Sequence, residues 1–268
     1  MSTILVTGGT GDLGRELVPR LLAKGHAVRV LSRRENPPLP AGAQAVRGDL
    51  ARGEGIDDAA AGVDVIVHCA SGARDAGLRG VVSPRATQAT DVEPTHRLLE
   101  IARANGHTRF VYTSIVGVDR VPLGYYRTKL ACERLIEQSG VPHTIFRSTQ
   151  WHTLGAEFAR RMTRLPVAVL PKGVSSQLLD PGEVAERIVS LVDDGVEGRA
   201  PDMGGPSVLT LREIGEKYLK ATGRHRTMVE VPLPGATMRA FREGGNLAPE
   251  HADGRITFDE WLTRNVVR

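Results

Sequence analysis

Tyr125 and Lys129 are the residues whose types and spacing most directly indicate acid–base chemistry. They lie four positions apart in GYYRTK, so on a helix their side chains share one face. An ammonium group beside a phenol favours the phenolate, which lowers the pKa of the phenol toward a range where it transfers protons efficiently. The spacing alone also fits an ordinary amphipathic helix in which Tyr125 packs and Lys129 is solvated. Tyr126 is the weaker candidate, because its i+4 neighbour is Leu130.

A glycine cluster follows the first apolar run of the chain, in ILVTGGTGDLGREL (residues 4–17). A tight turn at Gly8 and the small size of Gly11 would let a pyrophosphate lie on the N–H groups of a helix N-terminus, and Gly14 would let helix and strand pack closely. The Gly-Lys-Ser/Thr of a Walker A loop does not follow. The alternative is a plain glycine-rich turn. The strand–loop–helix context predicts a dinucleotide-binding loop made of Gly8, Thr10, Gly11, Asp12, Leu13 and Gly14.

The end of the second apolar run, VRVLSRR, bears on which dinucleotide binds. An acid here would bind the adenosine ribose hydroxyls and favour NAD, but this chain has Ser32, Arg33 and Arg34. An arginine attracts a 2′-phosphate that an acid would repel, so the sequence predicts NADP(H) over NAD(H). The alternative is that both arginines occupy a solvated loop. In RGDL, which includes Leu50, the Asp49 carboxylate can accept from the adenine amino group or cap the next turn.

The segments around these residues alternate between two patterns. Short apolar runs rich in β-branched residues predict buried parallel strands at 3–7, 27–31, 43–46, 63–68, 108–113 and 143–147. Between them, apolar residues at helical spacing, each run ending in glycine, predict helices within 12–25, 91–106 and 127–140. This alternation predicts an α/β fold with a doubly wound parallel sheet.

After Arg147 the pattern changes and becomes irregular over 148–179. Helices are expected at 180–195 (with an aspartate cap), at 210–223 and within 256–266, and 199–205 resembles a short edge strand and turn. We therefore expect a nucleotide-binding domain over 1–150, completed by 180–203. Segments 151–179 and 204–268 are expected to form a small C-terminal substrate lobe.

The composition is that of a globular protein with a full core: 268 residues, 41% hydrophobic and 25% charged. The net charge of +4 is scattered, with no basic run interleaved with aromatic residues, so no nucleic-acid partner is expected. Two cysteines, Cys69 and Cys132, form neither a disulfide framework nor a metal-ligand pattern, so no metal is expected. Reduced cysteines and the lack of a leader predict a cytoplasmic protein, and the lack of a membrane-length apolar run predicts no membrane partner. A monomer or homodimer is expected, although no residue pattern specifies the oligomeric state.

Taken together, these motifs resemble the short-chain dehydrogenase/reductase superfamily. TGGTGDLG matches its TGxxGxxG loop, RGDL its adenine-side motif, and GYYRTK contains its YxxxK pair as Tyr125 and Lys129. The chain length and the segments SIVGVDR and YYRTKLACERLIEQSGVPHTIFRSTQWH are similar to the atypical, NmrA-like branch of NAD(P)H-binding proteins. The resemblance covers nearly the whole chain and implies a Rossmann-type fold and a nicotinamide cofactor. That branch contains both reductases and proteins that only bind the cofactor.

The resemblance also implies roles for single residues. Lys129 would bind the nicotinamide ribose as well as influence Tyr125. Ser114, just past the fifth strand, would hydrogen-bond the substrate oxygen as negative charge develops on it, with Thr113 as a possible substitute. Small residues after the fourth strand would form a wall against the cofactor: Cys69, Ala70 and Ser71.

The segment RSTQWH, after the sixth strand, is expected to enter the site. Thr149 and Gln150 would contact the carboxamide, and Trp151 and His152 would form a substrate wall, with a structural lobe histidine as the alternative for His152. One residue departs from the superfamily pattern. Asp91 in DVEPT stands where an asparagine is common, which would alter the relay of protons to solvent.

The expected function is an NADP(H)-dependent oxidoreductase that transfers a hydride between nicotinamide and a small carbonyl or hydroxyl substrate, with Tyr125 as acid or base. The main alternative is a non-catalytic NADP(H)-binding redox sensor. An epimerase or quinone reductase on the same fold is a weaker alternative. The pair of Tyr125 and Lys129 favours the enzyme, because a sensor has no need of it.

Replacing Arg33 with alanine tests the choice of cofactor. NADP(H) should bind the wild type more tightly than NAD(H), because each charge-assisted contact to a 2′-phosphate contributes roughly 1.5–3 kcal/mol. Arg33→Ala should weaken NADP(H) binding by about that amount and leave NAD(H) binding nearly unchanged. Calorimetric titration of both cofactors measures this, and equal affinity of the wild type for both would contradict the prediction.

Overall fold

The structure is a computed structural model that describes residues 1–72 and 88–266. The chain divides into two compact units. The first consists of residues 1–114, 123–146 and 184–200, and the second of residues 115–122, 147–183 and 201–268. The expected dinucleotide loop and the Tyr125–Lys129 pair both belong to the first unit.

A parallel sheet forms the centre of the first unit. Within the described residues it has seven strands in the order β3-β2-β1-β4-β5-β6-β9. Its strands are β1 (Thr3–Thr7), β2 (Ala27–Ser32), β3 (Ala43–Arg47), β4 (Val65–His68), β5 (Arg109–Ile115), β6 (His143–Ser148) and β9 (Gly198–Arg199). The six strands predicted from the sequence are all confirmed. The edge strand and turn expected at 199–205 overlaps the observed edge strand β9 at Arg199 only. Continuous apolar runs such as ILV in β1 are fully buried, as expected of a sheet covered on both faces.

The strand order reverses direction between β1 and β4, which pair in parallel with each other. Ligands of open α/β sheets bind where the carboxyl ends of the strands diverge at such a reversal. The glycine loop leaves the end of β1, and the segment from Cys69 to Gly72 leaves the end of β4. The topology therefore brings two of the predicted ligand segments to one place.

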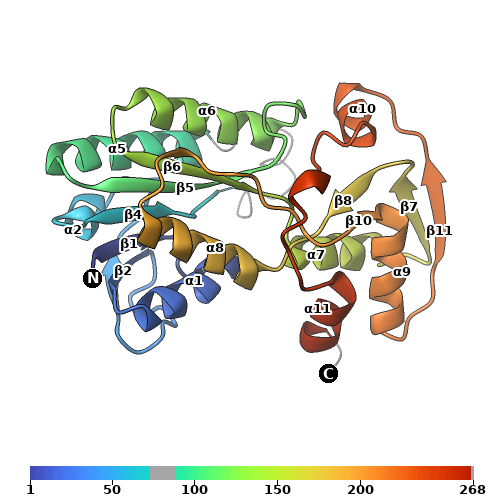
Figure 1. The fold of residues 1–268 in the computed structure, drawn as a ribbon. Coiled ribbons are helices and arrows are strands. Elements are labelled where there is room, and N and C mark those ends of the chain that lie inside the picture. Colours follow the sequence, from blue (N-terminus) through green and yellow to red (C-terminus); the bar gives the residue numbers. More distant parts are fainter. Residues whose placement is uncertain (73–87, 267–268) are drawn as a thin grey trace. The chain divides into compact units, whose positions relative to one another are not determined.

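Helices cover both faces of this sheet. Figure 1 shows α5 (Glu93–Asn105) and α6 (Gly124–Gln138) over one face, with α1 (Asp12–Ala23) and α8 (Pro181–Asp194) over the other. The short helix α2 (Ile56–Ala60) precedes β4, and a π-helical turn, η1 (Gln88–Val92), leads into α5. Apolar side chains of β4, β5 and α5, including Ile66, Phe110 and Leu98, form a core on the α5–α6 side. The doubly wound Rossmann-type fold expected from the sequence is confirmed.

The second unit is built differently. Its elements are α7 (His152–Met162), β7 (Val167–Pro171), β8 (Ser175–Gln177), β10 (Val208–Thr210), α9 (Leu211–Ala221), β11 (Thr227–Val231), α10 (Ala236–Arg242), η2 (Pro249–His251) and α11 (Phe258–Asn265). In the described residues β8 pairs with β10 in antiparallel and β7 with β11 in parallel. Helices α7, α9 and α11 share an apolar core. The sequence predicted α9 and α11, but it left 148–179 irregular and so missed α7, β7 and β8.

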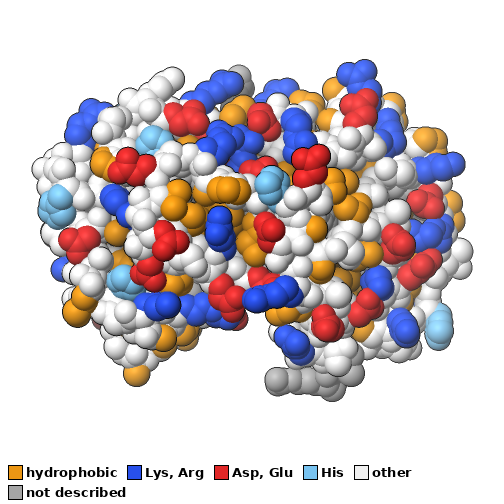
Figure 2. All heavy atoms as spheres, in the orientation of Figure 1, with side chains coloured by type: hydrophobic (Ala, Val, Ile, Leu, Met, Phe, Trp, Pro, Cys, Tyr) orange, Lys and Arg blue, Asp and Glu red, His pale blue; other side chains and the backbone are white. Residues whose placement is uncertain are grey.

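Charged side chains of both signs alternate over the face of the molecule drawn in Figure 2. In the part of the chain that the structure describes, none of the helices combines the length and apolar character needed to cross a bilayer.

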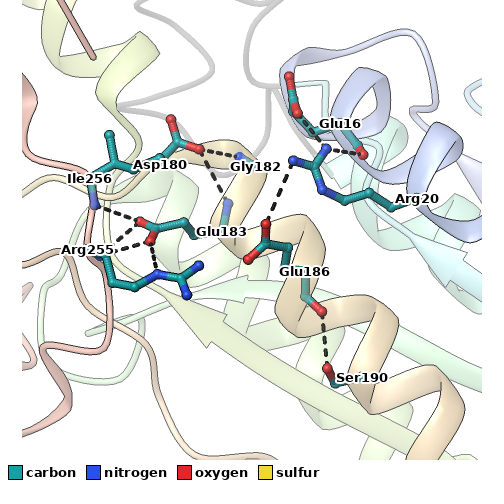
Figure 3. A network of polar contacts seen from close by, with 9 residues as sticks. All are labelled: Glu16, Arg20, Asp180, Gly182, Glu183, Glu186, Ser190, Arg255 and Ile256. Atoms are coloured by element: carbon teal, nitrogen blue, oxygen red, sulfur yellow. Dashed lines mark hydrogen bonds and ion pairs between the residues drawn. The ribbon is translucent and has the colours of Figure 1, made fainter. Parts of the chain in front are cut away.

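The N-terminus of α8 anchors the chain that leads into α11 (Figure 3). Asp180 Oδ1 accepts from the N–H of Gly182 at 2.7 Å, which confirms the predicted aspartate cap. The Glu183 side chain is 3% exposed and accepts from the backbone N–H of Arg255 at 2.9 Å and of Ile256 at 3.3 Å. It also accepts from Arg255 Nε at 3.0 Å. The buried Glu183 carboxylate thus accepts hydrogen bonds from two successive backbone N–H groups in the segment that precedes α11.

Replacing Glu183 with alanine should destabilise the protein by roughly 1.5–3 kcal/mol, because charge-assisted hydrogen bonds are lost and the partly buried N–H groups of Arg255 and Ile256 lose their acceptor. Glu186→Ala on the same helix is the matched control, since its side chain is 53% exposed and its contact with Arg20 is 4.0 Å long. That control should change the free energy of unfolding by less than about 0.5 kcal/mol. Urea unfolding measures both, and equal effects would contradict the assignment.

Candidate active site

The glycine loop between β1 and α1 is a close crossing of backbone segments. Gly8 has φ of +74°, and a Cβ there would lie 2.8 Å from the Ala70 nitrogen. A Cβ at Gly14 would lie 2.3 Å from the Gly8 oxygen. At Gly11 the Gly8 oxygen, at 3.2 Å, is the single described atom within 4 Å of an added Cβ. Gly8 and Gly14 therefore meet the requirements predicted for them, and an added Cβ at Gly11 would make a tight contact with one backbone oxygen.

Helix α1 begins directly after Gly11, which caps it without a side-chain hydrogen bond. The Gly11 N–H donates to the Gly8 oxygen at 2.9 Å, which closes the turn. The first N–H groups of a helix and its dipole attract anions. The absence of a side chain at Gly11, beside such a terminus, suits a pyrophosphate, so the residues present fit the expected dinucleotide.

The residues expected on the adenosine side lie at the ends of β2 and β3. Ser32 is buried, and its Oγ accepts from the Arg34 N–H at 3.1 Å, whereas the Arg33 and Arg34 side chains are exposed. Asp49 Oδ1 accepts from the Ala51 N–H at 2.9 Å. The turn-capping alternative for Asp49 is thus observed in the structure.

Cys69 stands at the end of β4 and is half-buried. Burial raises the pKa of its thiol to about 11, despite a 3.5 Å contact with the Thr113 hydroxyl. A thiol with so high a pKa stays protonated at neutral pH and is a poor nucleophile. The structure thus supports the interpretation of Cys69 as a strand-end residue that adds to a wall.

Lys129 is buried, with 4% of its surface exposed. Its Nζ donates to the Thr113 carbonyl at 2.9 Å and lies 4.5 Å above the centre of the Tyr112 ring. Burial lowers the pKa of Lys129, but nearby Tyr125 and Asp91 outweigh burial, and the pKa is raised above its ordinary value. Lys129 is therefore a buried ammonium, and the alternative of a solvated lysine is wrong.

Tyr125 is half-buried on the same helix. Burial raises the pKa of its phenol. Lys129 and a hydrogen bond with Ser71 lower it, while Asp91 raises it further, and the result is a pKa above the ordinary value. The predicted lowering of the Tyr125 pKa is therefore wrong in this structure. The attraction of Lys129 is present, but it does not offset the loss of hydration of the phenolate.

Ser114, near the end of β5, is 2% exposed. Its Oγ has no hydrogen-bond partner among the described residues. A buried hydroxyl normally finds a partner, and one without a partner in the protein often faces a ligand site. Ser114 directly follows Thr113, whose carbonyl holds Lys129. Ser114 and the Tyr125–Lys129 pair thus belong to the same unit, and Ser114 is one residue away from the carbonyl that holds Lys129.

A series of buried hydrogen bonds connects the strands and the helix that carry the candidate site. The Thr7 hydroxyl lies 2.6 Å from His68 Nδ1, His68 Nε2 lies 3.1 Å from the Thr95 hydroxyl, and that hydroxyl donates to the Asp91 carbonyl at 2.6 Å. Burial, with the charge of Lys129, lowers the pKa of His68 to about 3, so the ring is neutral. Because Thr95 donates its one proton to Asp91, His68 Nε2 must donate and Nδ1 must accept from Thr7. The chain joins β1, β4 and α5.

The residues expected from RSTQWH all belong to the second unit. Thr149 is buried, and its Oγ1 accepts from the Gly205 N–H at 3.3 Å. Trp151 Nε1 donates to Ser148 Oγ at 3.1 Å, and Gln150 is half-buried.

His152 is fully buried and stacks on Phe258, with Trp261 also nearby. Its Nε2 lies 2.9 Å from the Ile256 carbonyl and donates to it. Burial lowers the pKa of His152, so the ring is neutral, and its Nδ1 has no partner among the described residues. This packing favours the structural alternative for His152 over a role in proton transfer.

Comparison with known proteins assigns this chain to a family. The model of the NAD(P)H-binding family matches residues 8–193, more than half of the chain. The chain belongs to this NAD(P)H-binding family. The resemblance to atypical short-chain dehydrogenases/reductases is thereby confirmed, and pyridine nucleotides are the ligand class of the site.

Relatives within and around the NAD(P)H-binding family differ in what they do. This chain is 26% identical to the photosystem II assembly factor Ycf39 of Cyanophora paradoxa, over 98% of this chain and 82% of that protein. Over 153 residues, 50% of this chain and 45% of that protein, it is 35% identical to the 2-alkyl-3-oxoalkanoate reductase of Stenotrophomonas maltophilia. The solved UDP-glucose 4-epimerase of Thermus thermophilus in complex with NAD is 22% identical, with a TM-score of 0.70 over 95% of this chain and 100% of that one. The last likeness shows the fold.

Two features of the site were missed from the sequence. A Cβ at Gly9 would lie 2.6 Å from a methyl group of Val30, so this glycine is required for packing between β1 and β2. The chain through His68 was also missed, because single polar residues at the ends of apolar strands carry no spacing signal. Aligned polar residues at the ends of adjacent strands, Thr7 and His68, were the one available hint.

Gly11→Val tests whether the loop holds the pyrophosphate. A branched side chain at Gly11 would enter the space proposed for the pyrophosphate, so we expect cofactor affinity to fall by 100-fold or more, on the order of 3 kcal/mol, through steric exclusion. Its Cβ would also lie 3.2 Å from the Gly8 oxygen, which is a tight contact, so the unfolding temperature should fall modestly while the variant still folds. Fluorescence titration with NADPH and a thermal melt measure the two effects. Undiminished binding by a folded variant would exclude this loop as the phosphate site.

Proposed function

We propose that this protein is an NADP(H)-dependent oxidoreductase that transfers a hydride between the nicotinamide and a small carbonyl or hydroxyl compound. The observation that carries the proposal is the buried Lys129 ammonium, which is coupled to Tyr125 and held by the carbonyl of Thr113. The next residue, Ser114, has a buried hydroxyl without a partner among the described residues. A buried cation, a phenol and a free hydroxyl donor are the groups that carbonyl reduction requires.

The first unit supplies the groups that would hold the dinucleotide. The N-terminus of α1 and the absence of a side chain at Gly11 suit the pyrophosphate. The exposed Arg33 and Arg34 suit a 2′-phosphate, which supports NADP(H) over NAD(H). When bound, the nicotinamide supplies or accepts the hydride.

Three side chains would carry out the proton transfer and stabilise the charges that it creates: Tyr125, Ser114 and Lys129. Tyr125 would donate a proton to the substrate oxygen during reduction and accept it during oxidation. Ser114 would donate a hydrogen bond to the same oxygen and stabilise the charge that develops there. Lys129, charged and fixed by the Thr113 carbonyl, would stabilise the phenolate that Tyr125 becomes after it gives up its proton.

Two other functions draw support from particular observations. The similarity to a photosystem II assembly factor extends over 98% of this chain, which favours a non-catalytic NADP(H)-binding role in sensing or assembly. The fold shared with a UDP-glucose 4-epimerase is compatible with an epimerase, although that likeness concerns the fold alone. The coupling of Tyr125 to Lys129 favours the oxidoreductase.

Tyr125→Phe separates the oxidoreductase from the cofactor-binding protein. Loss of the hydroxyl should lower turnover of an accepted carbonyl by roughly 10²–10⁴-fold, because the general acid is removed, while NADPH affinity stays nearly constant. Tyr126→Phe is the matched control, a neighbouring buried tyrosine on α6, and should keep turnover. A spectrophotometric screen of small carbonyls with NADPH measures both. A substrate reduced equally fast by wild type and Tyr125→Phe would overturn the role of Tyr125.

A further inference from the structure

The small sheet of β7 and β11 in the second unit exposes one apolar face. The two strands lie side by side in Figure 1. Val167 and Val169 of β7 are 47% and 49% exposed, and Val229 of β11, which pairs with Val169, is 43% exposed. The alternate residues Ala168 and Leu170 are buried, so the opposite face packs against the rest of the second unit. Large apolar side chains that are exposed together on one face mark a candidate interaction surface.

The outer edge of β7 also carries unpaired backbone groups. The Lys172 N–H, just after β7, donates to the Val231 carbonyl of β11 at 2.9 Å. In a parallel pair, alternate residues of a strand bond to the neighbouring strand, so the backbone groups of Val167 and Val169 point away from β11. Within residues 1–72 and 88–266, no other strand pairs with β7, and these groups have no other hydrogen-bond partner. β7 is thus an edge strand that can accept a further strand.

Basic side chains stand at both ends of this edge. Arg164 precedes β7 and Lys172 follows it, and both are exposed. The Arg242 side chain lies beside the turn that follows β7. The one acid within the two strands, Glu230 of β11, is paired with Arg212 of α9 at 2.9 Å. The edge therefore attracts a ligand that carries negative charge at both ends and none in the middle.

The charges and the open edge exclude two simpler occupants. If two copies of the chain paired through β7 in antiparallel, Arg164 of one copy would meet Lys172 of the other, and a parallel pairing would place each cation opposite its equivalent. Like charges directly opposite each other destabilise a strand pair. A lipid surface would bury the unpaired N–H and C=O groups of Val167 and Val169 without giving them partners, which is costly. An extended protein segment satisfies both the charges and the backbone groups.

We propose that the outer edge of β7 binds a short extended segment of a partner protein as an added strand. Main-chain hydrogen bonds to Val167 and Val169 supply affinity, and the side chains of the segment supply specificity. Apolar residues at alternate positions of the segment pack on the exposed valines, and acidic residues at its two ends meet Arg164 and Lys172. Pro171 has no N–H, so the row of outward donors ends at Val169 and the added strand is short. This surface is independent of the proposed oxidoreductase activity.

A synthetic nonapeptide tests this surface directly. It has two glutamates at each end and Thr-Val-Thr-Val-Thr between them, with both termini capped, so it can span positions 164–172 with its valines opposite Val167 and Val169. Fluorescence anisotropy of the labelled peptide should show saturable binding that weakens as the salt concentration rises. The same peptide with lysines in place of the glutamates is the control and should not bind. Equal binding of both peptides, or no binding of the acidic one at up to about 1 mM, overturns the proposal.

Val169→Pro tests the role of the backbone edge. The substitution removes the outward N–H and leaves the hydrogen bonds between β7 and β11 in place, since proline is tolerated where the N–H of an edge strand faces solvent. Binding of the acidic peptide should weaken by about tenfold or more, because a hydrogen bond is lost and the ring obstructs the added strand. Val169→Thr keeps the N–H and the branched shape and should change the affinity by less than about threefold. Equal losses in both variants overturn strand addition.

N-methylated peptides give the same test without any change in the protein. In an antiparallel addition the N–H groups of the peptide valines face β7, and in a parallel addition those of the threonines do. N-methylation of one of these two sets should therefore abolish binding, and N-methylation of the other set should leave much of it. Undiminished binding of both methylated forms overturns the proposal, whether or not Val169→Pro folds.

Lys172→Ala tests the charge at the end of the edge. Affinity for the acidic peptide should fall by roughly two- to fivefold, because one exposed ion pair is lost. Lys24→Ala, which removes an exposed lysine of the first unit, is the matched control and should leave the affinity unchanged. Equal effects of the two variants contradict the contact with Lys172.

Two further measurements identify the rival occupants. Sedimentation of the wild type with phosphatidylserine vesicles that Val169→Asp abolishes would assign the face to a membrane surface. A dimer in analytical ultracentrifugation that Val169→Pro dissociates would assign the edge to a second copy of the chain. Either result overturns the proposal of a partner segment.

Discussion

The near-contact of the backbone at Gly8 and Gly14 is the constraint on which the first unit depends. A single added carbon at Gly14 would lie 2.3 Å from the Gly8 oxygen, so the start of α1 rests directly on the end of β1. This packing directs the N-terminus of α1 to the place where the sheet reverses its strand order. Because Gly8 also approaches Ala70, the same crossing fixes the segment after β4 that carries Ser71. The proposed pyrophosphate site and the groups proposed to transfer the proton therefore depend on the same backbone crossing.

Buried polar groups form the second layer of this support. Thr7, His68, Thr95 and Asp91 are each close to fully buried, and each has a partner of matching hydrogen-bond character. Such groups stabilise a fold only when all are satisfied, since a buried polar atom without a partner costs roughly 1–3 kcal/mol. This series of hydrogen bonds therefore favours one arrangement of β1, β4 and α5 over arrangements in which one of these elements is displaced and a bond is lost.

Repeating patterns made much of this predictable from the sequence. The predicted strands and helices came from apolar residues that repeat at the spacing of each element, and the structure contains them. The glycine spacing marked the start of α1, and the i,i+4 spacing of Tyr125 and Lys129 placed both on one helix, α6. The pKa of Tyr125 could not be predicted, because it depends on how burial weighs against Lys129, and burial is a property of the folded chain. Helix α7 was missed because the apolar residues of 148–179 have irregular spacing in the sequence, so no helical pattern is visible there. By contrast α9 and α11 begin with capping boxes that the residues themselves reveal.

The π-helical turn that carries Asp91 has a consequence for comparing sequences. A π turn contains one more residue than the α-helical turn it replaces, and such turns often occur at functional sites. Deleting one residue there would restore a regular helix and rotate the following positions by about 100° around its axis. In relatives without this extra residue, the position that aligns with Asp91 by number would point elsewhere. In such relatives, the residue that occupies the place of Asp91 in space lies one position away from the residue that a sequence alignment pairs with it. Superposition of the backbones identifies that residue.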